Sequence, residues 1–213
     1  MTFLPSLPIL ATFTVACILL AITPGPDMTL FLSRTVAGGR KLGFAAMLGA
    51  TTGLLFHALL AGFGLSALIA ASPNAFLVIK IVGALYLLFL AVQAIRHGSA
   101  LSIKKEGAME PSVRATYLTG IGINLTNPKI IIFYVTFLPQ FVEAGDPFAS
   151  GKLLFLALYF LVLGTIIGFI LIVIAAQFIS AMRANPKAMR IFDYSFAALM
   201  GGFAVKLLTA QGR

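Results

Sequence analysis

Long apolar runs alternate with short charged or turn-forming stretches along the whole chain. A helix needs about 20 apolar residues to cross a bilayer, so runs of this length predict membrane-spanning helices. The polar stretches between the runs predict an all-α membrane protein with six such helices and short connections. The expected helices cover residues 7–32, 42–70, 75–95, 115–141, 153–181 and 191–209.

Composition agrees with this pattern. Of 213 residues, 60% are apolar and 10% are charged, whereas a soluble domain is about one quarter charged. These values exclude a cytosolic enzyme, a disordered chain and a small secreted disulfide scaffold. The single cysteine, Cys17, cannot form an intrachain disulfide or a thiolate metal cage. We expect no metal site and no cofactor.

The net charge of +9 is explained by membrane topology. Basic residues collect in cytoplasmic loops, and ten of them fall in alternate connections, against Lys152 and Arg213 on the other side. The basic side is therefore expected to be cytoplasmic and both termini to face outward, with no nucleic-acid partner. The ten residues are Arg34, Arg40, Lys41, Arg96, Lys104, Lys105, Arg114, Arg183, Lys187 and Arg190.

The chain is expected to form one transmembrane domain made of two halves. Three helices in each half give the halves opposite orientations, so residues 1–97 and 113–213 would be inverted repeats joined by a cytoplasmic loop. The first helix of each half, helices one and four of the chain, contains a break near the membrane midplane. Interrupted helices at matching places in inverted repeats point to the binding site of a transporter.

The first break is Thr23-Pro24-Gly25-Pro26-Asp27. Residues that precede proline avoid helical geometry, and each proline removes a backbone donor. The helix should therefore unwind before Pro26 and restart there, because proline suits the first helical position. Asp27 would then start a half-helix, where the dipole favours a carboxylate. It is either the cap of a proline kink or a protonatable group in a substrate or ion pathway.

The second break is complementary in charge. Asn127 and Pro128 form an N-cap and first-position pair, and Lys129 adds a positive charge to the same turn. A charge at this depth costs about 2.5–3.5 kcal/mol. Asp27 and Lys129 therefore predict either a structural ion pair or a shared ligand. For a zwitterion, Lys129 and the helix end would bind the carboxylate, and Asp27 would bind an ammonium or a proton.

Motifs in this order and at these spacings resemble the LysE/RhtB family of amino-acid exporters. The resemblance implies a six-helix carrier in the bacterial inner membrane that exports amino acids or related small metabolites by proton antiport. The motifs are Thr23 to Asp27, Ser33-Arg34, Gly38-Gly39-Arg40, Gly49 to His57, Gly83-Ala84-Leu85-Tyr86-Leu87, Asn127-Pro128-Lys129 and Phe137-Leu138-Pro139-Gln140-Phe141.

The candidate site follows from the two breaks. The expected substrate ligands are Thr23, Gly25, Asp27, Asn124, Asn127 and Lys129, with Pro24, Pro26 and Pro128 as helix breakers. Asp27 is also the candidate for proton coupling, together with His57, which is alternatively a packing residue. A single carboxylate in the site slightly favours neutral amino acids.

Three other functions are weighed against amino-acid export. A divalent-metal exporter needs clustered ligands, and one Asp with one His is a thin set. A membrane-embedded enzyme would need an Asp pair, a Ser–His arrangement or a zinc helix, which the sequence lacks. A non-transporting assembly protein would not account for two costly breaks. The Gly49 and Gly53 face could serve either internal packing or a homodimer.

Overall fold

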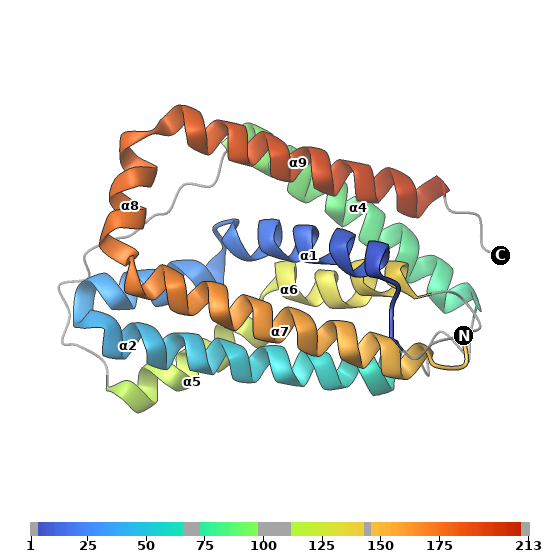
Figure 1. The fold of residues 1–213 in the computed structure, drawn as a ribbon, viewed down its shortest axis with the longest axis horizontal. Coiled ribbons are helices and arrows are strands. Elements are labelled where there is room, and N and C mark those ends of the chain that lie inside the picture. The colour runs from blue at the N-terminus through green and yellow to red at the C-terminus, as the bar shows by residue number, and fades with distance from the viewer. Residues whose placement is uncertain (1–3, 66–72, 98–111, 143–145, 210–213) are drawn as a thin grey trace.

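A computed structural model describes residues 4–65, 73–97, 112–142 and 146–209, and these residues form helices without any strand (Figure 1). Lys104, Lys105 and Arg213, and residues 66–70 of the second predicted helix, lie outside the described residues. Segments η1 and η2 are π-helical, and η3 is a 3₁₀ helix. The elements are α1 (Leu7–Ile22), α2 (Pro26–Leu59), η1 (Leu60–Leu65), α4 (Pro73–His97), α5 (Val113–Leu125), α6 (Pro128–Ile132), η2 (Phe133–Phe137), η3 (Leu138–Phe141), α7 (Ala149–Val173), α8 (Ala175–Ala184) and α9 (Pro186–Thr209).

Helix α2 folds back on itself at Gly38 and Gly39, whose backbone angles are not helical. Gly39 has φ +80°, a conformation that glycine adopts without steric cost. Figure 1 shows the part of α2 before this turn running to one end of the molecule and the part after it returning. The charged stretch between the first two predicted helices therefore coincides with a sharp turn.

Two described helices are long and apolar enough to cross a membrane, Pro26–Gly64 and Ala149–Val173. A third candidate is the pair Val113–Leu125 and Pro128–Phe141, which is bent by 48° at its break. At 1.5 Å per residue, the 39 residues of the first stretch would extend about 58 Å. That is nearly twice the thickness of the bilayer core. The turn at Gly38 and Gly39 divides this stretch into two shorter helical parts.

The end predicted for the fifth helix, at residue 181, is wrong. Helix α7 stops at Val173, because Ile174 leaves helical geometry with φ −102° and ψ 19°. The guanidinium of Arg40 donates a hydrogen bond of 2.8 Å to the Val173 carbonyl and so satisfies this helix end. Helix α8 then turns across the end of the molecule (Figure 1).

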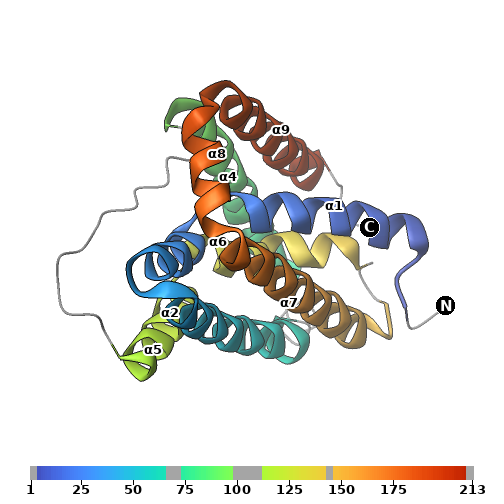
Figure 2. The ribbon, with the colours of Figure 1, turned by 60° about the vertical axis from the view of Figure 1, so that its left-hand side comes forward.

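Aromatic side chains hold α1 against the second half of the chain. Phe13 of α1 packs edge-on against Phe141 at a ring distance of 5.0 Å. Phe137 in turn meets Phe203 of α9 at 4.3 Å. Figure 2 shows α1 lying between α6 and α9. This cluster fixes the end of α1 next to the start of α6, which is where the two breaks meet.

Glycines bring α2 and α5 close together. A Cβ atom at Gly49 would collide with the backbone of Tyr117 and Gly120, and one at Gly53 would lie 2.5 Å from Oδ1 of Asn124. Only glycine allows this approach. The Gly49 and Gly53 face therefore packs inside the chain, and it is not a free surface for a homodimer.

Candidate functional site

The first break lies between α1 and α2. Helix α1 ends at Ile22, and the backbone N–H of Thr23 still donates to the Leu19 carbonyl at 3.0 Å. Gly25 is extended, and Pro26 occupies the first position of α2. The carbonyls near the end of α1, including that of Leu20, have no partner within their own helix, because the chain leaves helical geometry there.

The second break lies between α5 and α6. Helix α5 ends at Leu125, and Asn127 is the N-cap of α6, with Pro128 in the first position. The side-chain oxygen of Asn127 accepts a hydrogen bond of 3.0 Å from the backbone N–H of Lys129. This break is therefore capped by its own residues.

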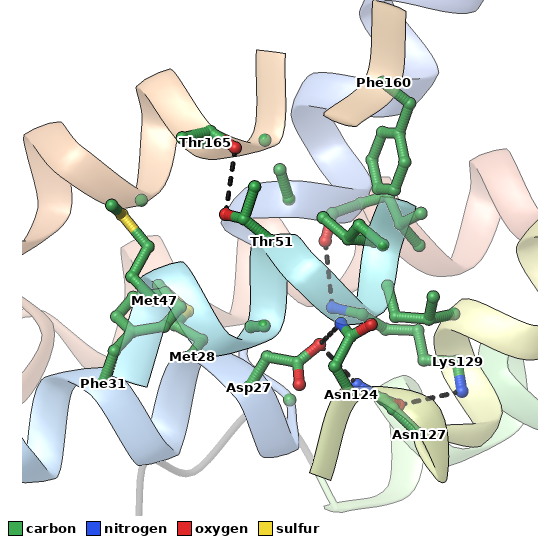
Figure 3. A pocket seen from close by; sticks show the side chains of 18 of the residues that line it. Asp27, Met28, Phe31, Met47, Thr51, Asn124, Asn127, Lys129, Phe160 and Thr165 are labelled. Atoms are coloured by element: carbon green, nitrogen blue, oxygen red, sulfur yellow. Dashed lines mark hydrogen bonds between the residues drawn. The ribbon is translucent and has the colours of Figure 1, made fainter. Parts of the chain in front are cut away.

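The carboxylate of Asp27 is held by the second break (Figure 3). Its Oδ2 atom accepts hydrogen bonds from Asn124 Nδ2 at 2.8 Å and from Asn127 Nδ2 at 2.9 Å. Both asparagines are 1% exposed. The other carboxylate oxygen, Oδ1, is buried and has no hydrogen-bond partner. Asp27 therefore keeps one acceptor atom free for a ligand or a proton.

The ammonium group of Lys129 crosses to the first break. It donates hydrogen bonds to the carbonyls of Thr23 at 2.8 Å and Leu20 at 3.0 Å. Neither of these bonds goes to Asp27, so the direct Asp27–Lys129 ion pair that the sequence suggests is replaced by a helix cap. An ammonium has three N–H donors. One of the three N–H donors of Lys129 is therefore left over after its bonds to the Thr23 and Leu20 carbonyls.

Both breaks open onto one cavity of about 70 Å³ between α1, α2, α5, α6 and α7. On this scale the cavity holds roughly five water molecules. Five of the six expected substrate ligands line it, namely Gly25, Asp27, Asn124, Asn127 and Lys129. Thr23 is the exception, because its hydroxyl is turned back to the Leu19 carbonyl at 2.6 Å.

His57 lies behind this cavity rather than on its wall. Its Nε2 atom is 3.4 Å from the Asn124 carbonyl, and its ring stacks on Tyr134 at 5.7 Å. The Asn124 side chain binds Asp27, so His57 is one residue removed from the carboxylate. This position leaves both the packing and the proton-coupling interpretations open.

Helix α7 supplies part of the wall that sequence reasoning missed. The hydroxyl groups of Thr51 on α2 and Thr165 on α7 lie 3.1 Å apart at the cavity. The signal in the sequence was Gly164 and Gly168, which are four residues apart and therefore share one face of the helix. The other lining residues that were not predicted are apolar: Leu20, Ala21, Met28, Phe31, Met47, Ala50, Leu54, Ile130, Phe160 and Leu171.

The described part of the chain contains no cluster of side chains that could bind a metal ion. There, no group of three or more His, Cys, Asp or Glu residues is placed to hold a metal ion.

Comparison with known proteins identifies the family. The sequence profile of the LysE type translocator family matches residues 18–211. This chain belongs to the LysE type translocators. The match spans both breaks and the cavity. A LysE type translocator is a transporter, which confirms the expectation that the chain is not an enzyme and makes it a multi-pass membrane protein.

Individual relatives of this LysE type translocator are similar over nearly their whole length. The uncharacterized membrane protein YrhP of Bacillus subtilis (strain 168) is 31% identical over 196 residues, which cover 88% of this chain and 92% of YrhP. The leucine efflux proteins of Salmonella choleraesuis (strain SC-B67) and Salmonella paratyphi A (strain ATCC 9150 / SARB42) are each 29% identical over 202 residues, which cover 94% of both chains. No solved structure matches the translocator.

Proposed function

We propose that this translocator exports neutral amino acids from the cytoplasm by proton antiport, with its substrate site at the two helix breaks. One observation carries the proposal: a buried carboxylate oxygen without a partner and a lysine ammonium belong to residues that line the same cavity. A free amino acid carries one ammonium and one carboxylate. It therefore complements these two groups. Two relatives of this chain are named leucine efflux proteins, which also supports an amino-acid substrate.

The proposed topology has six crossings in two inverted halves. The crossings are α1 with the first part of α2, the second part of α2 with η1, α4, α5 with α6 to η3, α7, and α9. The 16 residues of α1 extend only about 24 Å, so α1 needs the continuation after its break to cross. Figure 1 supports a shared side for the termini, because the start of α1 and the end of α9 lie opposite α8.

Arg40 supports the assignment of the α8 end to the cytoplasmic side of the inner membrane. Its bond to Val173 places it beside the start of α8, and Arg190 donates to the Ile95 carbonyl near the end of α4 at 2.9 Å. The described residues between η3 and α7 include no Lys or Arg, and Lys152 lies in the first turn of α7. Basic residues thus gather at one end, as cytoplasmic ends do.

The proposed cycle uses Asp27 twice. Facing the cytoplasm, its free oxygen binds the ammonium of the substrate, while the third N–H of Lys129 binds the carboxylate. Facing outward, a proton neutralises Asp27, and the loss of negative charge weakens the hold on the ammonium. The empty carrier then returns with the proton, so the inward proton gradient drives export. His57 is the alternative proton acceptor in this proposal, because its Nε2 atom lies 3.4 Å from the backbone carbonyl of Asn124, whose side chain binds Asp27.

Counterflow in proteoliposomes tests the proposal. Vesicles loaded with unlabelled alanine, leucine, lysine or glutamate are diluted into the labelled amino acid, with and without a pH gradient. We expect wild type to accumulate leucine, and Asp27→Asn and Lys129→Met to lose at least 90% of the exchange. Lys152→Met, which changes a charge outside the cavity, is the matched control. A wild type that is folded and exchanges no amino acid would refute the function.

Coupling is tested separately from binding. An inward proton gradient should accelerate net leucine efflux by wild type, and leucine efflux should move protons inward. Asp27→Asn should show neither effect. If Asp27→Asn retains normal proton-coupled efflux, the coupling role passes to another residue, and His57→Gln is the next variant to measure.

A further inference from the structure

The cavity has two chemically different ends (Figure 3). Asp27, Asn124, Asn127 and Lys129 form the polar end. Met28, Phe31 and Met47 gather on the side away from Lys129. These three side chains are 3%, 8% and 6% exposed, so they form a buried apolar surface next to the charged groups.

The wall of α7 that faces this surface includes two glycines, Gly164 and Gly168. A Cβ atom at Gly168 would lie 3.1 Å from the sulfur of Met47, so the two helices are in contact there. A Cβ atom at Gly164, one turn earlier, would have nothing within 4 Å. Because Gly164 lines the cavity, the space beside it is part of the cavity. A ligand side chain can enter where a protein side chain is missing.

The hydroxyl groups of Thr51 and Thr165, at the border of the apolar end of the cavity, are already hydrogen-bonded. The Thr165 hydroxyl donates to the Leu161 carbonyl at 2.7 Å, so the 3.1 Å bond between Thr165 and Thr51 is donated by Thr51. Both hydroxyl protons are therefore used. The charged residues among those that line the cavity are Asp27 and Lys129, and both lie at the other end.

We propose that the end of the cavity lined by Met28, Phe31, Met47, Gly164, Gly168 and Leu171 binds the side chain of the exported amino acid and selects an aliphatic one. The inference rests on the proposed function, in which Asp27 and Lys129 bind the ammonium and the carboxylate. A charged side chain would then be buried without a partner, which is unfavourable. Methionine side chains are flexible and adapt to aliphatic groups of different shape.

Filling the space beside Gly164 tests this subsite. In counterflow with alanine and leucine, Gly164→Val should lower leucine exchange about tenfold or more relative to alanine exchange, as expected when a hydrophobic pocket loses room for a few carbon atoms. Gly122→Val is the matched control: a Cβ atom there also meets nothing within 4 Å, and Gly122 is exposed and outside the cavity. Its leucine-to-alanine ratio should equal that of wild type.

A second pair of variants keeps the test decisive if Gly164→Val does not fold. Gly164→Ala adds one carbon atom to open space and should lower the leucine-to-alanine ratio by a smaller factor. Met47→Ala widens the subsite and should raise phenylalanine exchange relative to leucine exchange.

The outcomes separate this inference from the function on which it rests. Active variants at Gly164 and Met47 with unchanged substrate ratios would overturn the subsite alone. Wild-type exchange of lysine as fast as leucine would also overturn it, because a cationic side chain has no partner there. Absence of exchange for every amino acid would instead refute the proposed function.

Discussion

The two helix breaks satisfy their backbone groups in opposite ways. The break after α5 is capped locally, since Asn127 accepts the N–H of Lys129 two residues later. The break after α1 has no such cap, and the carbonyls of Leu20 and Thr23 depend on the ammonium of Lys129 from the other break. The first break is therefore stabilised by a side chain from the second break, in addition to its own bond from the Thr23 N–H to the Leu19 carbonyl.

The dependence also runs in the other direction. Asp27 of the first break accepts the side-chain amides of Asn124 and Asn127. Separating the breaks would leave all of these groups without partners in a low-dielectric environment, where each unpaired group is costly. The cross-links between the breaks are therefore the structural brace of the proposed binding site. In the proposed function, a substrate binds to the carboxylate oxygen of Asp27 and the ammonium donor of Lys129 that these cross-links leave without a partner.

Removing the ammonium should break this arrangement most strongly. Lys129→Met deletes two buried hydrogen bonds from a charged donor and leaves the α1 carbonyls unsatisfied. At about 1–3 kcal/mol per unsatisfied group, we expect a loss of about 3 kcal/mol. Thermal unfolding of the purified protein in detergent should show a midpoint lower by roughly 10 °C. Lys152→Met is the control, and an equal loss in both variants would contradict the brace.

Neutralising the carboxylate should cost less. Asp27→Asn keeps one oxygen that can accept from both asparagines, but it loses the charge and replaces the other carboxylate oxygen with an amide NH2. Hydrogen bonds to ionised groups are about twice as strong as neutral ones, so we expect a loss of about 1–2 kcal/mol in the same unfolding measurement. The order of the two variants is the test. If Asp27→Asn is less stable than Lys129→Met, the first break does not depend on the ammonium.

The local parts of this arrangement are predictable from the sequence. The stops near Ile22 and Leu125 follow from prolines that disfavour helix at the preceding residue, and the Asn127 cap follows from its position before Pro128. The partner of Lys129 is not predictable in this way. It depends on the packing of α1 against α6, which the cluster around Phe13 establishes and which no local pattern encodes.

The role of α7 escaped prediction for a related reason. Gly164 and Gly168 resemble many small residues in apolar helices, and only their position opposite α2 makes them a cavity wall. The early end of α7 at Val173 depends on Arg40, which is 133 residues away in sequence. Long-range contacts therefore decide both the shape of the site and the end of the helix.

A smaller change tests whether the asparagines must be held in place. In Gly53→Ala, the new Cβ atom would lie 2.5 Å from Oδ1 and 2.8 Å from Cβ of Asn124, so Asn124 must shift away from Asp27. Overpacking of this kind costs about 1–3 kcal/mol, less the gain from replacing glycine in a helix. We expect a net loss of about 1 kcal/mol and slower leucine counterflow.

The control for the asparagine test is Gly122→Ala, which adds the same carbon atom to the neighbouring helix α5 in open space. It should be neutral or slightly stabilising, with wild-type transport. If Gly53→Ala behaves in the same way, the position of Asn124 is not critical for the link between the breaks.

The smallest effect is expected at a charged pair outside the breaks. Asp146, in the connection before α7, accepts from the ammonium of Lys152 and from the backbone N–H of Phe148. The hydrogen bond from Lys152, followed by that from Phe148, lowers the pKa of the Asp146 carboxyl below its ordinary value. A lowered pKa in the folded state means that the carboxylate stabilises the fold above the ordinary pKa, and that this contribution is lost as the pH falls through the lowered value.

Asp146→Asn should therefore unfold at a slightly lower temperature than wild type at pH 7, and the difference should shrink below about pH 4. Because the pair is near the surface, added salt should also reduce the difference. The effect of Lys129→Met should persist in high salt, since its partners are buried carbonyls inside the protein. If both variants respond equally to salt, the link between the breaks is a screened surface interaction, and the two breaks are not braced by buried hydrogen bonds.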